Sequence, residues 1–123
     1  MKPPAGLVLI ADDEPHVREV LRDFLTSEGY VVVTVASGAD VLEATPTVQP
    51  DVIVVDMVMP GVSGTDVLAA LRRTGVTVPV ILISGTPRIV EEGFFRVLRK
   101  PFNLRAVGDA VAAAVNHQRG SSA

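Results

Sequence analysis

The chain has 123 residues, of which 48% are hydrophobic and 20% charged, and its formal net charge is −3. This length fits one domain that buries roughly two-thirds of its unfolded surface, and the composition excludes an intrinsically disordered protein. The small negative charge, without a block of like charges, argues against direct nucleic-acid binding, and the lack of cysteine excludes disulfides and thiolate metal sites.

The amino-terminal segment and the apolar runs give no sign of targeting or membrane insertion. Residues 1–6 lead directly into a short apolar run and lack the apolar stretch and cleavage site of a signal peptide. No apolar run approaches the roughly 18 residues that span a membrane. We therefore expect a cytoplasmic domain without a membrane partner.

Continuous apolar runs alternate with helically spaced apolar residues, which is the pattern of repeated strand–helix units. The runs predict five strands, at residues 7–11, 31–35, 52–56, 80–84 and 95–99. Because they are continuous rather than alternating, they indicate a parallel sheet covered by helices on both faces. Right-handed crossovers then favour an α/β, flavodoxin-like doubly wound sheet with the strand order 2-1-3-4-5.

Two helices are expected in the first half of the chain. The first begins near Pro15, and its apolar stripe at i, i+3, i+4, i+7 and i+8 consists of Val17, Val20, Leu21, Phe24 and Leu25. The second is short, follows the cap residue Ser37 and carries Val41 and Leu42 inward. The segment Thr45-Pro46-Thr47 is expected to end it.

Two more helices are expected further on. One begins near Ser63 or Gly64 and stops by Gly75, with Val67, Leu68 and Leu71 facing inward. The last follows the cap residue Asn103, and its inward residues are Val107, Val111, Ala114 and Val115. We expect a single domain over residues 1–123, with a core at about 7–117 and a frayed tail at 118–123.

The connection between the fourth and fifth strands is short. If the fifth strand takes residues 94–99, only the nine residues 85–93 remain, whereas a parallel crossover usually needs about a dozen. About six of these residues have room to be helical, and they rise roughly 9 Å, whereas about 16 Å are needed to return past a five-residue strand. We therefore expect a shortened or missing fourth helix.

Reactive side chains follow the apolar runs of four predicted strands: Asp12, Asp13, Asp56, Ser84 and Lys100. Because the carboxyl ends of parallel strands meet at one edge of a sheet, we expect these groups to lie together. Converging carboxylates repel one another unless a cation is present, and Mg²⁺ prefers oxygen ligands. Each residue alone is compatible with a helix cap, a turn or a strand end, but the set in this order predicts metal-assisted phosphoryl chemistry.

Each of these groups has an expected role. Asp13, Asp56 and the backbone carbonyl of Val58 are predicted as direct Mg²⁺ ligands, whereas Asp12 is expected to act through a bound water. The carboxylate of Asp56 is also a competent nucleophile toward phosphorus. Lys100 and Ser84 would then hold the transferred phosphoryl oxygens.

The segments 7–15, 56–64 and 100–102, together with Ser84, make residues 7–117 similar to the receiver domains of two-component response regulators. The resemblance implies that Asp56 accepts a phosphoryl group from a histidine kinase or a histidine phosphotransfer protein. It implies that the acidic pair and Asp56 hold Mg²⁺, and that phosphorylation switches contacts with a downstream protein target. It also makes the Lys100–Pro101 peptide bond a candidate for the cis form.

The chain departs from this family at two places. Val97 occupies the position, three residues before Lys100, where family members often carry an aromatic side chain that swings inward on phosphorylation. The shortened fourth crossover lies in the region that the family uses to signal to partners.

Two other functions stay open. A Mg²⁺-dependent phosphatase with an aspartyl nucleophile would need a second aspartate where Val58 stands, and a cap domain for which the chain has no room. The complete set of five groups argues against a receiver-like interaction module that never takes phosphate, although the short crossover keeps this alternative open. On the receiver interpretation, the domain is not an enzyme beyond its own phosphorylation and dephosphorylation. It would be a stand-alone regulator or part of a longer protein such as a hybrid kinase.

Overall fold

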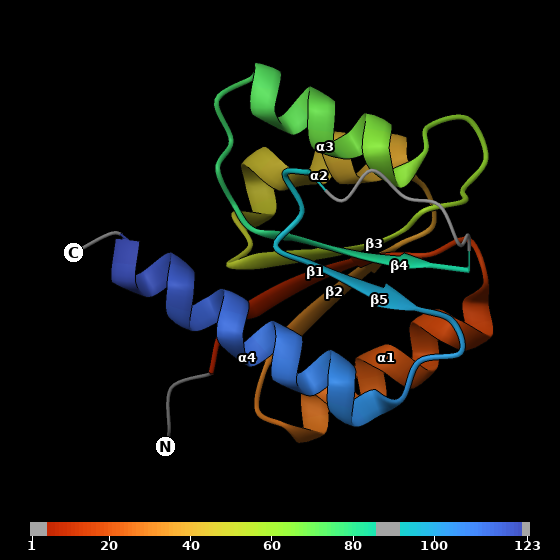
Figure 1. Ribbon diagram of the computed structural model, residues 1–123, viewed down its shortest axis with the longest axis vertical. Coiled ribbons are helices and arrows are strands. Elements are labelled where there is room, and N and C mark those ends of the chain that lie inside the picture. Colours follow the sequence, from red (N-terminus) through yellow and green to blue (C-terminus); the bar gives the residue numbers. More distant parts are fainter. Residues whose placement is uncertain (1–4, 86–91, 122–123) are drawn as a thin grey trace.

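The computed structural model describes residues 5–85 and 92–121, which form a parallel sheet between two layers of helices (Figure 1). The strands are β1 (Leu7–Ala11), β2 (Val31–Val35), β3 (Val52–Asp56), β4 (Val80–Ser84) and β5 (Arg96–Arg99). The helices are α1 (Pro15–Ser27), α2 (Gly38–Val48), α3 (Gly64–Arg73) and α4 (Leu104–Ser121). The strand order is β2-β1-β3-β4-β5 and every neighbouring pair is parallel, which confirms the predicted doubly wound topology.

Helices cover both faces of the sheet. In Figure 1, α2 and α3 lie on one face, and α1 and α4 lie on the other. Successive residues of a strand alternate between these two cores; on β1, Val8 and Ile10 pack in the core under α1 and α4, whereas Leu9 and Ala11 pack in the core under α2 and α3. β3 and β4 are buried at every position. Two covered faces therefore explain why the strands read as continuous apolar runs.

Two details of α1 and α2 differ from the prediction. Val20 is 36% exposed, because it lies at the border of the α1 stripe while Leu21 and Leu25 are buried. The expectation that Thr45-Pro46-Thr47 ends the second helix is wrong, since α2 contains Pro46 and runs to Val48. A proline this close to the end removes only one helical hydrogen bond. The hydroxyl of buried Thr45 donates to the carbonyl of Val41 at 2.6 Å, and the helix ends at Gln49, whose φ is 51°.

The starts of α3 and α4 agree with the predicted caps. Ser63 and Asp66 form a reciprocal capping box at the start of α3. At the start of α4, the side-chain oxygen of Asn103 accepts a 2.7 Å hydrogen bond from the backbone N–H of Ala106. The end of α4 differs from the prediction: the helix continues to Ser121, so residues 118–121 are helical where a frayed tail was expected.

The predicted shortening of the fourth helix concerns residues 85–93, and residues 86–91 lie outside the described part of the chain. Gly85 and residues 92–95, which the structure does describe, are not helical. None of the helices in the described ranges is both long enough and apolar enough to cross a membrane.

Gly64 joins the site edge of the sheet to α3, and we expect its substitution by alanine to destabilise the fold. A Cβ atom there would lie 2.6 Å from Cδ1 of Leu82 and 2.9 Å from the carbonyl oxygen of Asp56. Overpacking of this kind costs about 1–3 kcal/mol. Urea unfolding should show this loss for Gly64→Ala but not for the control Gly120→Ala, whose Cβ meets nothing within 4 Å. Equal stability of the two variants would contradict this packing.

Candidate functional site

The turn after β1 presents two aspartates in different environments. Asp12 is 1% exposed, whereas Asp13 is exposed to solvent. Oδ1 of Asp12 accepts a 2.9 Å hydrogen bond from the backbone N–H of Glu14. Oδ2 of Asp12 is buried and has no hydrogen-bond partner among the described residues. A buried carboxylate oxygen without a partner is costly, so it indicates a place for a further positive group.

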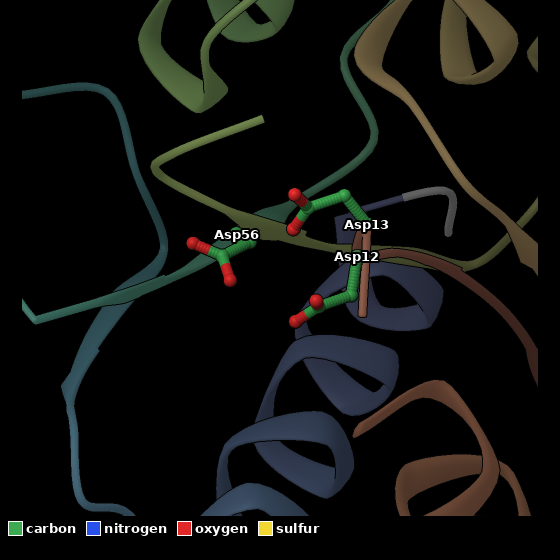
Figure 2. A group of neighbouring side chains, drawn as sticks. All are labelled: Asp12, Asp13 and Asp56. Atoms are coloured by element: carbon green, nitrogen blue, oxygen red, sulfur yellow. The ribbon is translucent and has the colours of Figure 1, made fainter. Parts of the chain in front are cut away.

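Asp56, the last residue of β3, lies next to this pair. It is 4% exposed, and its Oδ1 accepts a 3.0 Å hydrogen bond from the backbone N–H of Val58. One carboxylate oxygen from each of Asp12, Asp13 and Asp56 lies within 4.8 Å of the other two. Figure 2 shows the three carboxylates facing a common space at the carboxyl edge of the sheet.

Lys100 and Ser84 reach the same edge through the β4–β5 ladder. Ser84 is buried at the end of β4, and its carbonyl accepts a 2.8 Å hydrogen bond from the backbone N–H of Lys100. Nζ of Lys100 lies 2.7 Å from Oδ2 of Asp56, which makes a direct ion pair. The Lys100–Pro101 peptide bond is cis, as the sequence predicted. All five predicted residues therefore lie at one edge of the sheet.

A pocket of about 280 Å³ opens at this edge, lined by Asp13, Glu14, Asp56, Val58, Gly85 and Lys100. The side chain of Val58 is among the most exposed large apolar ones in the described part of the chain, at 69%. Asp56 therefore lies at the base of an open pocket rather than in a closed core.

Burial and mutual repulsion shift the ionisation of this cluster. Burial raises the pKa of Asp12 from 3.8 to about 6, and the charge of Asp56 adds to this, although the N–H of Glu14 acts in the opposite direction. Burial acts to lower the pKa of Lys100, but the hydrogen bond and the charge of Asp56 outweigh it, so the pKa of Lys100 is raised. Lys100 therefore stays protonated and neutralises part of the charge of Asp56.

The donor set fits a hard divalent cation such as Mg²⁺. Three carboxylates offer oxygen atoms within 4.8 Å of one another, and Lys100 supplies one positive charge against their three negative ones. Oδ2 of Asp12 is buried and finds no hydrogen-bond partner in the described ranges 5–85 and 92–121. Oxygen ligands, excess negative charge and an open side toward solvent are what Mg²⁺ sites in proteins provide.

Three further residues that were not predicted from the sequence lie around these five. Glu14 and Gly85 line the pocket, and Nη1 of Arg18 donates a 2.7 Å hydrogen bond to the backbone carbonyl of Asp12. Helical spacing contained a signal for Arg18, because a residue one turn into α1 lies beside the turn that precedes the helix.

The fold and this site define a doubly wound α/β domain with a carboxylate cluster at the carboxyl edge of its sheet, and comparison with known proteins identifies the family. The response regulator receiver domain family matches residues 8–112, and the chain belongs to this family. The transcriptional regulatory protein KdpE of Mycobacterium tuberculosis is 37% identical over 115 residues, which are 89% of this chain and 50% of KdpE. The chain spans about half the length of this relative.

Solved structures show the same fold. A response regulator receiver domain protein from Clostridium thermocellum is 27% identical and superposes with a TM-score of 0.86, covering 93% of this chain and 97% of that one. The response regulator TrrA of Thermotoga maritima, solved in complex with Mg²⁺-BeF, is 27% identical with a TM-score of 0.80, covering 88% and 97%.

The raised pKa of Asp12 predicts a pH-dependent stability in the absence of metal. The native carboxyl holds its proton up to about pH 6, whereas the unfolded one loses it near 3.8. The native state thus binds more protons between these values, so in EDTA the Asp12 contribution to stability should fall as pH rises through this window. The free energy of unfolding, measured by denaturant titration across pH 4–7, should decrease with pH in wild type but not in Asp12→Asn. At pH 7 the variant should be more stable than wild type by on the order of 1–3 kcal/mol. The same slope in both proteins would contradict the assignment.

Proposed function

We propose that this receiver domain accepts a phosphoryl group on Asp56 from a phosphohistidine donor and thereby switches its protein contacts. The observation that carries the proposal is the position of Asp56, which lies at the base of an open pocket between Lys100 and two further carboxylates. The carboxylate is thus a nucleophile that a donor can reach, with a cation already in place beside it.

Mg²⁺ would be held by Asp13, Asp56 and the backbone carbonyl of Val58, with Asp12 acting through a bound water. When bound, the ion neutralises charge that otherwise opposes the approach of an anionic phosphoryl group. Asp12 is the one of the three carboxylates that is held by the N–H of Glu14 rather than open to the pocket. This supports an indirect role for Asp12 and a direct one for Asp13.

The residues of this chain have separate roles in the transfer. An oxygen of Asp56 forms the new P–O bond while the P–N bond of the donor breaks and the donor histidine leaves as an imidazole. Lys100, released from its 2.7 Å contact with Asp56, is placed to pair with the phosphoryl oxygens. Ser84, at the end of the next strand, is expected to donate its hydroxyl to another of these oxygens.

The proposed partners follow from membership of the receiver family. The phosphoryl donor would be a histidine kinase or a histidine phosphotransfer protein. The downstream target would be a protein that binds the phosphorylated and unphosphorylated forms of this domain differently. A turnover phosphatase is disfavoured because Val58 stands where such an enzyme needs an acid, and the side chain of Val58 has no proton to give.

Asp56→Asn should abolish phosphoryl incorporation without unfolding the domain, because an amide has the shape of the carboxylate but is a poor nucleophile. Intact mass spectrometry after incubation with acetyl phosphate and Mg²⁺ should show one added phosphoryl group in wild type and none in the variant. Asp66→Asn, in the α3 cap, is the control and should still be labelled. Persistent labelling of Asp56→Asn would place the acceptor elsewhere, and an unlabelled wild type would favour an interaction module.

Millimolar Mg²⁺ should stabilise the native domain, because it relieves repulsion among three carboxylates. A ligand at ten times its dissociation constant adds roughly 1.4 kcal/mol to the free energy of unfolding, which raises the melting temperature measurably. Asp13→Ala should lose most of this rise. An equal rise in wild type and Asp13→Ala, or no rise in wild type, would show that the metal assignment is wrong.

A further inference from the structure

We propose that Arg18 is a positioning residue for the acidic cluster: it fixes the turn that presents Asp12 and Asp13 and so raises the affinity of the cluster for a divalent cation. This inference rests on the proposed function, since it concerns the same metal site. None of the motifs that carry the family resemblance includes Arg18.

Arg18 holds both ends of the turn between β1 and α1. Its side-chain Nη1 donates a 2.7 Å hydrogen bond to the carbonyl of Asp12, and its backbone N–H donates a 3.1 Å hydrogen bond to the carbonyl of Glu14. Asp13, whose carboxylate lines the pocket, lies between these two carbonyls in the chain. The side chain of Arg18 therefore restrains the peptide unit that directly precedes a predicted metal ligand, and the backbone of the same residue restrains the carbonyl of Glu14 that follows it.

Few other hydrogen bonds to this turn are found within the part of the chain that the structure describes. Pro15 has no N–H to give, and α1 begins after Glu14 without a side-chain hydrogen bond at its cap. The N–H of Glu14 is bound to Oδ1 of Asp12, and the N–H of Asp12 reaches the carbonyl of Val35 at 3.3 Å. Without the guanidinium, the Asp12 carbonyl would lose a charge-assisted hydrogen bond and the turn would be free to shift.

The charge of Arg18 makes the test decisive, because positioning and electrostatics predict opposite results. A positive charge near the carboxylates repels a divalent cation, so a purely electrostatic Arg18 would weaken metal binding, and its removal would tighten it. A positioning Arg18 preorganises the ligands, so its removal would weaken binding in spite of the lost repulsion.

The first measurement is the dissociation constant of Mg²⁺, obtained by NMR titration of the labelled folded domain. Arg18→Met should bind Mg²⁺ more weakly, by roughly fivefold, the ratio that corresponds to one lost hydrogen bond. Arg22→Met is the matched control, since it removes the same charge one turn further along α1 from a side chain whose ion pair is to exposed Asp23. It should bind Mg²⁺ as tightly as wild type or slightly more tightly. Arg18→Lys should recover part of the affinity, because its ammonium keeps a donor for the carbonyl of Asp12.

Unchanged or tighter Mg²⁺ binding by Arg18→Met would overturn the inference. A wild type that does not bind Mg²⁺ would instead overturn the proposed function.

The second measurement needs no metal and keeps the two proposals distinguishable. In EDTA, the amide hydrogen of Glu14 should exchange roughly fivefold faster in Arg18→Met than in wild type or Arg22→Met, because the turn opens more often. Amides of β3 and β4 should change much less. Equal acceleration at Glu14 and in these strands would mean that Arg18 acts on overall stability, which would overturn its positioning role.

Discussion

Asp12, Asp13 and Asp56 each bring one carboxylate oxygen within 4.8 Å of the other two, and this proximity sets the main electrostatic problem of the fold. Like charges at this distance repel, so the fold must supply both a cation and a rigid support. Lys100 provides the cation, with its Nζ 2.7 Å from Asp56. Rigidity comes from the sheet, because each of these groups ends or directly follows a strand that is paired on at least one side. The packing of the buried strands thus offsets the repulsion between the carboxylates that the same strands bring together.

The carboxylate cluster contains a buried oxygen without a hydrogen-bond partner among the described residues, which indicates a functional role rather than a stabilising one. A purely structural ion network would satisfy its buried oxygens, yet Oδ2 of Asp12 has no partner among the described residues and its pKa is raised to about 6. Residual negative charge at the base of an open pocket favours a divalent cation and, with it, an anionic phosphoryl group. A ligand that neutralised this charge would therefore stabilise the site.

Membership of the receiver family establishes the kind of domain, whereas the kinase and the downstream target are questions for experiment. The chain covers about half of KdpE, a relative whose name describes a transcriptional regulator. Functions carried by the other half of such relatives are not assigned to this chain. For this chain, the features that bear on signalling are local: Val97 where an aromatic side chain is frequent in the family, and the short connection from β4 to β5, whose central residues lie outside the described part.

The sequence by itself determined the strands, their order and the five residues at the sheet edge, because buried parallel strands leave continuous apolar runs and their polar successors must emerge together. The sequence did not predict that α2 would contain Pro46 and run to Val48, or that α4 would continue to Ser121. The folded arrangement was needed to show that Oδ2 of Asp12 has no partner among the described residues and that Arg18 donates to the carbonyl of Asp12. These contacts depend on distances of a few ångströms between side chains and backbone groups in the folded chain. The spacing of residues along the sequence does not predict such distances.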